Sequence, residues 1–234
     1  MKKIFGTGVL SGNQLKIIAA IFMTLDHMGI ILFRSVDVLR IMGRFAFPIL
    51  DYLIAEGFYY TKNRKKYLFK MALFGAVIQL IYFVVERSLY QGIFVTFSLS
   101  IALCFGADNL MKKKTTGSFV WFALMICAVF MLTEWLPEVL SGTDFCVDYG
   151  FFGVIIPVIV FMAEKKQEKL LFFLLGLILL SASLGGIQWW CLGSVLFIAF
   201  YNGERGRVKM KNFFYAYYPL HLAVLYIVAE LFCK

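Results

Sequence analysis

An aspartate and a histidine, Asp26 and His27, stand side by side in the first long apolar stretch of the chain. An aspartate in the middle of a membrane helix costs about 2.5–3.5 kcal/mol on insertion scales, so such residues usually face a bundle interior and mark a pathway or a reaction site. The chain has only two histidines, and the second, His221, also lies in an apolar stretch. A histidine titrates near neutral pH and can take a proton from a hydroxyl or an amine.

Other ionisable side chains are expected at related depths. Because a helix rises 1.5 Å per residue, His27, Asp51 and His221 fall in the middle third of a hydrocarbon core about 30 Å thick, with Arg44 nearer the outer face. Adjacent helical residues point about 100° apart, so Asp26 and His27 cannot aim at one atom. We expect Asp26 to pair with Arg44 across the first helical hairpin, since a buried carboxylate needs a cationic partner.

These residue types leave three kinds of function open. A mid-membrane histidine could pass an acyl group from an inner donor to an outer acceptor, and the same residues could serve a proton-coupled transporter. Alternatively, the polar groups could only hold the helices of a scaffold together, although a neutral side chain would do so at lower cost. Inverted repeats and paired broken helices, which are typical of transporters, are not evident in the sequence.

The elements that must position these side chains are membrane helices. The chain of 234 residues is 62% hydrophobic and 16% charged, whereas a soluble domain is about 45–50% apolar. This composition predicts an all-α, polytopic integral membrane bundle that forms one domain over residues 1–234. A span needs about 20 mostly apolar residues. We expect nine spans, near 14–33, 41–60, 68–86, 93–111, 118–136, 149–164, 168–184, 187–202 and 213–232.

The basic residues predict how the spans are oriented. With the N-terminus inside, 18 of the 23 basic residues fall in inner segments, among them Lys2 and Lys3. The outer side keeps Arg34, Arg40, Arg44, Arg87 and Lys234. This asymmetry predicts an inner N-terminus and an outer C-terminus. It also accounts for the net charge of +9, so no basic patch remains to indicate a nucleic-acid partner.

The cysteines and the N-terminus carry less information. The five cysteines, including Cys233, are scattered without a CxxC pair, which argues against a disulfide framework or a zinc site, so we expect no metal. The chain begins somewhat like a signal peptide, but polar residues 11–14 interrupt the pattern. We expect Ser11 or Asn13 to cap the first helix.

Four segments give the chain a resemblance to the TraX family of integral membrane proteins, best known for acetylating the N-terminus of F-type pilin. The segments are Leu15-Lys16-Ile17-Ile18-Ala19 with Met23-Thr24-Leu25-Asp26-His27-Met28-Gly29; Gly43-Arg44-Phe45-Ala46-Phe47-Pro48-Ile49-Leu50-Asp51-Tyr52 with the stretch 55–64; Asp148-Tyr149-Gly150-Phe151-Phe152-Gly153; and Tyr215-Ala216-Tyr217-Tyr218-Pro219-Leu220-His221-Leu222. They run from the first expected span to the last.

The resemblance implies a function. TraX-like proteins look like distant relatives of the membrane acyltransferases that modify surface sugars, in which a first-helix histidine moves acetyl from cytoplasmic acetyl-CoA to an acceptor across the membrane. It therefore implies an acetyltransferase in a bacterial cytoplasmic membrane, with acetyl-CoA as donor and the N-terminus of a pilin-like peptide or a glycan as acceptor. His27 would be the general base or would carry acetyl transiently.

The remaining roles follow from this reading. Asp26 would orient His27 or pair with Arg44. Arg44, or the backbone amides near Asp148 and Tyr149, could stabilise an oxyanion. Tyr218 and His221 would complete the cavity from the last span, and Asp51 would add to the polar centre that binds substrate. The basic inner loops could hold the phosphates of CoA, although topology alone explains them.

Overall fold

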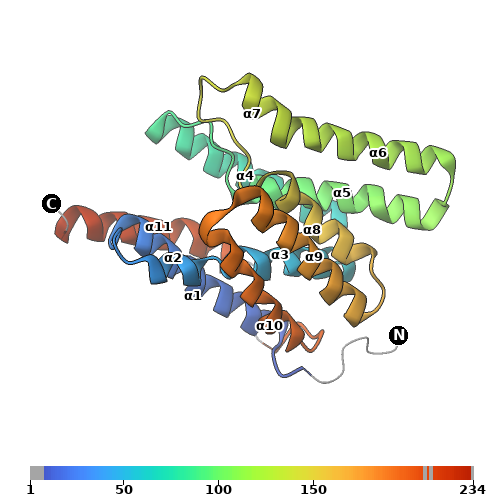
Figure 1. Cartoon of the computed structure of the whole chain (residues 1–234), viewed down its shortest axis with the longest axis horizontal. Helices are drawn as coiled ribbons and strands as arrows, with labels where there is room; N and C mark the ends of the chain where they lie inside the picture. Colours follow the sequence, from blue (N-terminus) through green and yellow to red (C-terminus); the bar gives the residue numbers. More distant parts are fainter. Residues whose placement is uncertain (1–7, 208–209, 211–212, 233–234) are drawn as a thin grey trace. The chain divides into compact units, whose positions relative to one another are not determined.

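The computed structural model describes residues 8–207, 210 and 213–232, and within these residues the chain is helical, with two isolated β-bridges and no β-strand (Figure 1). The lysines predicted inside at positions 2, 3, 209 and 211, together with Cys233 and Lys234, lie outside the described residues. Helix α1 (Gly12–Ile31) begins at Ser11, whose hydroxyl accepts from the Gln14 amide while the Gln14 side chain accepts from the Ser11 amide. Of the two predicted caps, Ser11 is therefore the one that is used.

Six described helices are long and apolar enough to cross a membrane. They are α1, α4 (Arg64–Glu86), α5 (Ile93–Lys113), the segment Thr116–Val139, α9 (Lys166–Leu184) and the segment Tyr215–Phe232 of α11 (Phe213–Phe232). Shorter apolar helices cover Gly150–Met162 and Gly186–Ala199. All nine expected spans overlap helical segments, so the prediction of a multi-pass helical membrane protein is confirmed, while the count of nine and the orientation stay predictions.

One expected span is interrupted. The stretch 41–60 was expected to form one helix, but it contains the end of α2 (Asp37–Gly43) and then α3 (Ala46–Tyr60), separated by a turn at Arg44 and Phe45. Pro48 explains the break. Its nitrogen has no hydrogen to donate to the carbonyl of Arg44, and its ring would clash with that carbonyl in a continuous helix. Proline is tolerated where it stands, in the first turn of α3.

The contacts of the chain divide into two compact units. The first consists of Met1–Leu50 and Ser181–Lys234. In it α1 packs against α2 and α11, and the 3₁₀-helix η2 (Gly186–Gly193) packs against α2 and α10 (Ser194–Ala199). Three aromatic side chains, Phe22, Phe45 and Phe197, meet with ring centroids 5.2–6.1 Å apart and form part of its core.

The second unit, Asp51–Leu180, is built around α5. This helix packs against α4, α6 (Thr116–Phe130) and α8 (Gly150–Met162). After α6 the chain makes a π-helical turn, η1 (Met131–Trp135), and continues as α7 (Leu136–Val139). The turn places Glu134 so that its carboxylate accepts from the Phe151 amide at 2.6 Å, which satisfies a free amide at the start of α8.

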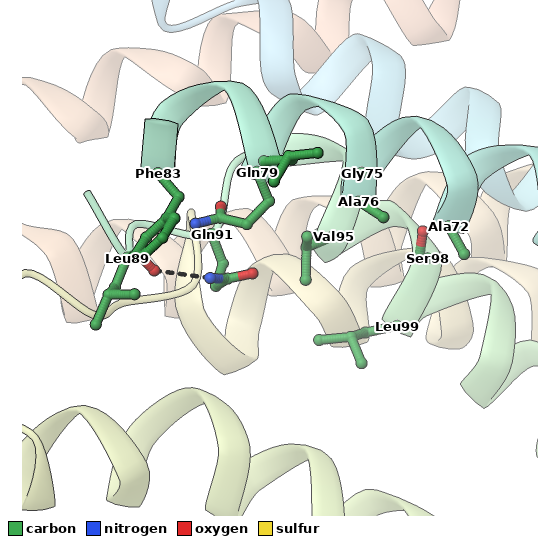
Figure 2. Close-up of a pocket in the computed structure, with 11 residues that line it drawn as sticks. Ala72, Gly75, Ala76, Gln79, Phe83, Leu89, Gln91, Val95, Ser98 and Leu99 are labelled. Atoms are coloured by element: carbon green, nitrogen blue, oxygen red, sulfur yellow. Dashed lines mark hydrogen bonds between the residues drawn. The ribbon is translucent and has the colours of Figure 1, made fainter. Parts of the chain in front are cut away.

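A cavity of about 590 Å³ lies between α4 and α5 in this second unit (Figure 2). Small residues on α4, such as Gly75 and Ala76, make room for it, and Val95 and Ser98 of α5 lie on its other side. Gln79 and Gln91 are the amide side chains among its lining residues.

Candidate functional site

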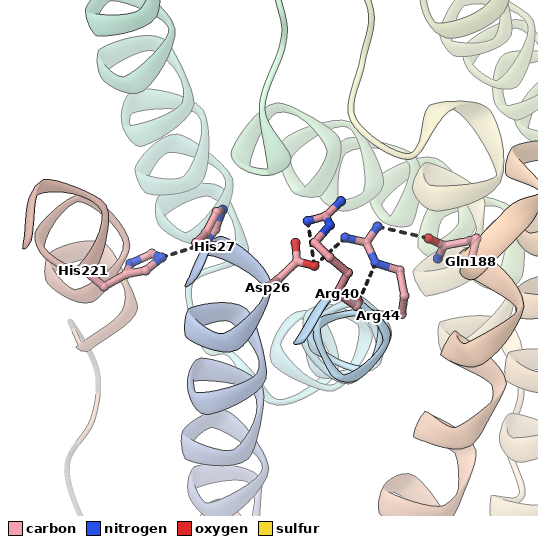
Figure 3. A network of polar contacts seen from close by, with 6 residues as sticks. All are labelled: Asp26, His27, Arg40, Arg44, Gln188 and His221. Carbon is pink, nitrogen blue, oxygen red and sulfur yellow. Dashed lines mark hydrogen bonds and ion pairs between the residues drawn. The ribbon is translucent and has the colours of Figure 1, made fainter. Parts of the chain in front are cut away.

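The ion pairs of Asp26 form one side of the candidate site, which lies within the first unit (Figure 3). Asp26 Oδ1 is 2.6 Å from Nη2 of Arg44, with which it forms a hydrogen bond, and 2.8 Å from Nη1 of Arg40. The Arg40 contact is not aligned as a hydrogen bond. Asp26 and Arg44 are mostly buried, at 15% and 13% side-chain exposure. The pair predicted between these two residues is present, and the second arginine leaves the cluster with one net positive charge.

Local backbone structure holds the two arginines on one carboxylate. Arg40 and Arg44 are four residues apart, so they project from the same face of α2 and its C-cap. Arg44 Nε also donates to the carbonyl of Arg40, and its Nη1 donates to Gln188 Oε1 of η2, both at 3.4 Å. Gly43 lets the helices approach, because a Cβ at this position would overlap the Asp26 carboxylate.

The two histidines meet on another face of α1, the one towards α11 (Figure 3). Nδ1 of His27 lies 2.9 Å from Nε2 of His221, which stands on α11 and is 8% exposed. Asp26 faces α2 while His27 faces α11, as the 100° step between neighbouring helical residues requires. The first unit thus brings together four predicted site residues in two adjoining groups, a carboxylate–arginine cluster and a histidine pair.

The hydrogen bonds of the pair define its tautomers. His221 Nδ1 is 2.8 Å from the Tyr217 carbonyl oxygen, which can only accept, so His221 Nδ1 carries a hydrogen. With both rings neutral, Nε2 of His221 then accepts from Nδ1–H of His27. The lone pair of His27 is left on Nε2, which points away from His221 in Figure 3. A neutral histidine with a free Nε2 can act as a base or as a nucleophile.

Two tyrosines of α11 support the histidines. The Tyr217 ring stacks on His221 at 5.1 Å and 11°, and its hydroxyl is 2.5 Å from Thr24 Oγ1 on α1. Tyr218 is buried, and its ring meets His27 and His221 edge-on at 6.4 and 5.7 Å. The predicted residue Tyr218 is therefore a neighbour of both histidines.

The other predicted site residues belong to the second unit. Asp51 is completely buried, and neither of its carboxylate oxygens has a hydrogen-bond partner among the described residues. The Asp148 carbonyl accepts from Thr96 Oγ1, and its amide donates to Gln91. Tyr149 takes a left-handed backbone conformation before α8. The nearby amides of residues 150, 151 and 153 donate to the chain itself, and their predicted oxyanion role stays a prediction.

Sequence reasoning missed three residues of this site. Arg40 was assigned only to the outer positive charges, although its spacing of four from Arg44 was a signal that the two share a face. Gly43 carried no signal of its own, because its role depends on how closely α1 and α2 approach. Gln188 lies in the short 3₁₀-helix η2, within a stretch expected to form an apolar span, and apolar length does not predict its contact with Arg44. Among the described residues, no group of three or more His, Cys, Asp or Glu could hold a metal ion.

These features define a class: a multi-pass helical membrane protein whose first long helix carries an arginine-bound aspartate and, next to it, a histidine that pairs with a second histidine on the last helix. Residues 11–229 match the TraX protein family, and the chain belongs to that family. It is 28% identical to a probable fimbrial assembly protein of Dichelobacter nodosus, over 92% of this chain and 94% of the relative. It is 25% identical to an uncharacterized protein of Rickettsia prowazekii, over 68% and 58%. No solved structure matches.

Proposed function

We propose that this protein is a membrane-embedded acetyltransferase that moves an acetyl group from acetyl-CoA to an amine or hydroxyl acceptor. The observation that carries the proposal is the bond between His27 and His221, because it leaves the lone pair of His27 on Nε2, on the residue next to Asp26 of the carboxylate–arginine cluster. The TraX family is associated with pilin acetylation, which supports the same chemistry.

The histidine can work in either of two ways. As a general base, His27 Nε2 takes the proton of the acceptor amine or hydroxyl while the acceptor attacks the thioester carbonyl and CoA leaves as a thiolate. As a carrier, Nε2 itself attacks the carbonyl and CoA leaves as a thiolate. The acceptor then attacks the acetyl carbon, its proton passes to the thiolate, and the bond from the acetyl group to Nε2 breaks. In both routes His221 is a positioning residue, since its Nε2 holds the hydrogen of His27 on Nδ1.

The arginine cluster suits the charge that develops in this reaction. Attack on a thioester places negative charge on the carbonyl oxygen, and preorganised donors stabilise such an oxygen most effectively away from water. Arg40 and Arg44 together exceed the charge of Asp26 by one, so the cluster can stabilise an anion. Asp26 holds both guanidinium groups in place.

A basic end of the second unit suits the phosphates of CoA. The ion pair between Arg64 and Asp108, at 3.0 Å, ties the start of α4 to the end of α5. Six exposed lysines flank these two helix ends: Lys62, Lys65, Lys66, Lys112, Lys113 and Lys114. The same lysines support a cytoplasmic position for this end of the second unit. That position agrees with the proposed topology, which has nine spans and an inner N-terminus in a bacterial cytoplasmic membrane.

The acceptor is proposed to be the N-terminus of a pilin-like peptide, with a surface glycan as the alternative. The name of the Dichelobacter relative, a fimbrial assembly protein, favours the peptide. The bilayer, acetyl-CoA and this acceptor are then the partners of the chain, which works as one domain.

Release of CoA thiol from acetyl-CoA by the purified protein tests the activity without knowledge of the acceptor. We expect His27→Ala to lower the rate about 10²–10⁴-fold. Ile21→Ala is the matched control, because Ile21 is 53% exposed on the same helix and lies more than one turn before Asp26. A near-normal rate in His27→Ala, with the protein folded, would show that the histidine only joins helices and would favour the transporter alternative.

The two routes can be separated by trapping. If His27 carries acetyl, rapid quenching during turnover should leave an acetyl group on the peptide that contains it, in wild type and not in His27→Ala. If it is a base, that peptide stays unmodified while the enzyme turns over at the same rate.

A labelling experiment tests the orientation. In a variant without the native cysteines, a single cysteine at Asp144 should react with an impermeant reagent added to intact cells, and a single cysteine at Lys65 should react only after lysis. Reaction at Lys65 from outside would overturn the proposed topology.

A further inference from the structure

The cavity between α4 and α5 in the second unit has no part in the proposed reaction. Its volume, about 590 Å³, lies within the range of small-molecule sites. Its walls are almost entirely apolar, and on α4 they are lined by small residues that leave space: Ala72, Gly75 and Ala76. The neighbouring residues of α4 that face outward are exposed and aliphatic, as Leu73 and Val77 are. The cavity therefore opens on a surface that suits hydrocarbon.

The extent of the cavity limits what can fill it. Its lining on α4 runs from Ala72 to Phe83, a rise of about 16 Å. That is about half of a hydrocarbon core roughly 30 Å thick. It includes the last half of α4, the first half of α5 and the connection between them. A membrane helix of another protein would need a groove across the whole core, whereas one acyl chain of a lipid needs only one leaflet.

The two ends of the cavity differ in polarity (Figure 2). Towards the α4–α5 connection lie Gln79, Gln91 and Phe83, and Gln79 Oε1 is buried with no hydrogen-bond partner among the described residues. Just beyond, the exposed guanidinium of Arg87 lies 5.9 Å from the centroid of the Phe83 ring. An apolar slot with an amide and an arginine at one end matches the order of groups in a phospholipid: acyl chain, glycerol region, phosphate.

We propose that this cavity binds one acyl chain of a glycerophospholipid, with the lipid phosphate at Arg87. Gln79 Oε1 then accepts a hydrogen bond from a hydroxyl or amine of the lipid head group. The bound lipid fills the space between α4 and α5 and makes this face a specific lipid site rather than ordinary contact with the bilayer.

Photo-crosslinking with phosphatidylglycerol that carries a diazirine in one acyl chain tests the proposal on the whole protein in vesicles. We expect crosslinks on the cavity-facing residues of α4 and α5, and we expect Ala76→Phe to remove them by filling the cavity. The matched control is Val77→Phe, which adds the same side chain one residue away on the exposed face of α4 and should keep the crosslinks. Elution volume in size-exclusion chromatography shows that each variant is folded.

The head group is tested in the same assay. Unlabelled phosphatidylglycerol should compete more strongly than diacylglycerol, which lacks the phosphate, and Arg87→Gln should abolish that difference, whereas inorganic phosphate should not compete. Crosslinks spread evenly over exposed helices such as α6, or unchanged in Ala76→Phe, would mean contact with bulk lipid only and would overturn the proposal. Equal competition by the two lipids in the wild-type protein would overturn the role of Arg87.

Discussion

Two buried aspartates, one in each unit, have opposite surroundings. Asp26 in the first unit contacts two arginines through one oxygen, whereas Asp51 in the second is completely buried and neither oxygen has a hydrogen-bond partner among the described residues. An isolated buried carboxylate is so costly that the group takes up a proton instead. The comparison predicts a neutral acid at Asp51, whereas the Asp26 carboxylate is held by two cations.

The helices around each aspartate explain the difference. Next to Asp26, α2 supplies arginines four residues apart, and Gly43 allows close approach. In the second unit, no described residue donates a hydrogen bond to either carboxylate oxygen of Asp51. Polar residues at similar predicted depths can therefore have different electrostatic roles.

The largest effect is expected from Asp26→Ala. Removing one partner of a buried ion pair costs about 3–5 kcal/mol, because the other charge is left without compensation. Here two guanidinium groups lose their anion, so we expect a large fall in thermal stability in detergent and little CoA release.

Asp26→Asn separates charge from shape in that experiment. The amide keeps the size of the side chain but cannot neutralise the arginines, so Asp26→Asn should resemble Asp26→Ala. Wild-type stability in Asp26→Asn would contradict a charged Asp26 and remove the contrast with Asp51.

Gly43→Ala should have the next largest effect. The added Cβ would overlap the Asp26 carboxylate and force α1 and α2 apart, and overpacking of this kind typically costs about 1–3 kcal/mol. Thermal unfolding in detergent measures it, with Gly117→Ala of α6 as the control, because a Cβ there meets nothing within 4 Å. Equal melting temperatures in the two variants would show that the close approach at Gly43 is not needed.

How far the sequence predicts this structure depends on the kind of information used. Apolar length predicted the helices, and capping chemistry predicted the start of α1 as one of two residues. The pair of Asp26 with Arg44 followed from the need of a buried carboxylate for a cation. Depth along a helix, however, gives the position of a residue only along the membrane normal. By depth alone, Asp51 was expected in the same polar centre as Asp26, although the two residues belong to different units.

The parts that were not predicted depend on close packing. The break before α3 could have been expected from Pro48, but average hydropathy over the segment hid it. The expected span 187–202 begins within the 3₁₀-helix η2, which is capped by Gly185 and starts at Gly186, two glycines with positive φ, and Gln188 of this helix bonds to Arg44. No pattern of apolar residues encodes such a turn.

A smaller effect is expected from Asp51→Asn. If Asp51 is a neutral acid, an amide of nearly the same shape should change stability by less than about 1 kcal/mol and leave CoA release unchanged, since no charged interaction is lost. Thermal unfolding and thiol release, measured beside Asp26→Asn, decide this. Loss of turnover in folded Asp51→Asn would show that this carboxyl takes part in the reaction and would contradict its assignment as an inert neutral acid.

The smallest effect concerns a third aspartate, Asp144, which extends the comparison to an exposed loop outside the helices. Its carboxylate accepts from the Ser88 hydroxyl at 2.5 Å and from the Leu89 amide at 2.8 Å, and these bonds hold the pKa of Asp144 below its usual value. A carboxyl whose folded pKa is lowered stabilises the fold above its unfolded pKa, about 3.9, and this contribution is lost as the pH falls through the folded pKa. Asp144 therefore stays ionised at neutral pH, and Asp144→Asn should speed hydrogen exchange at the Leu89 amide without changing global melting. An NMR titration of labelled aspartate should give a midpoint below about 3.9; a midpoint at or above that value would show that the loop contacts do not favour the charged form.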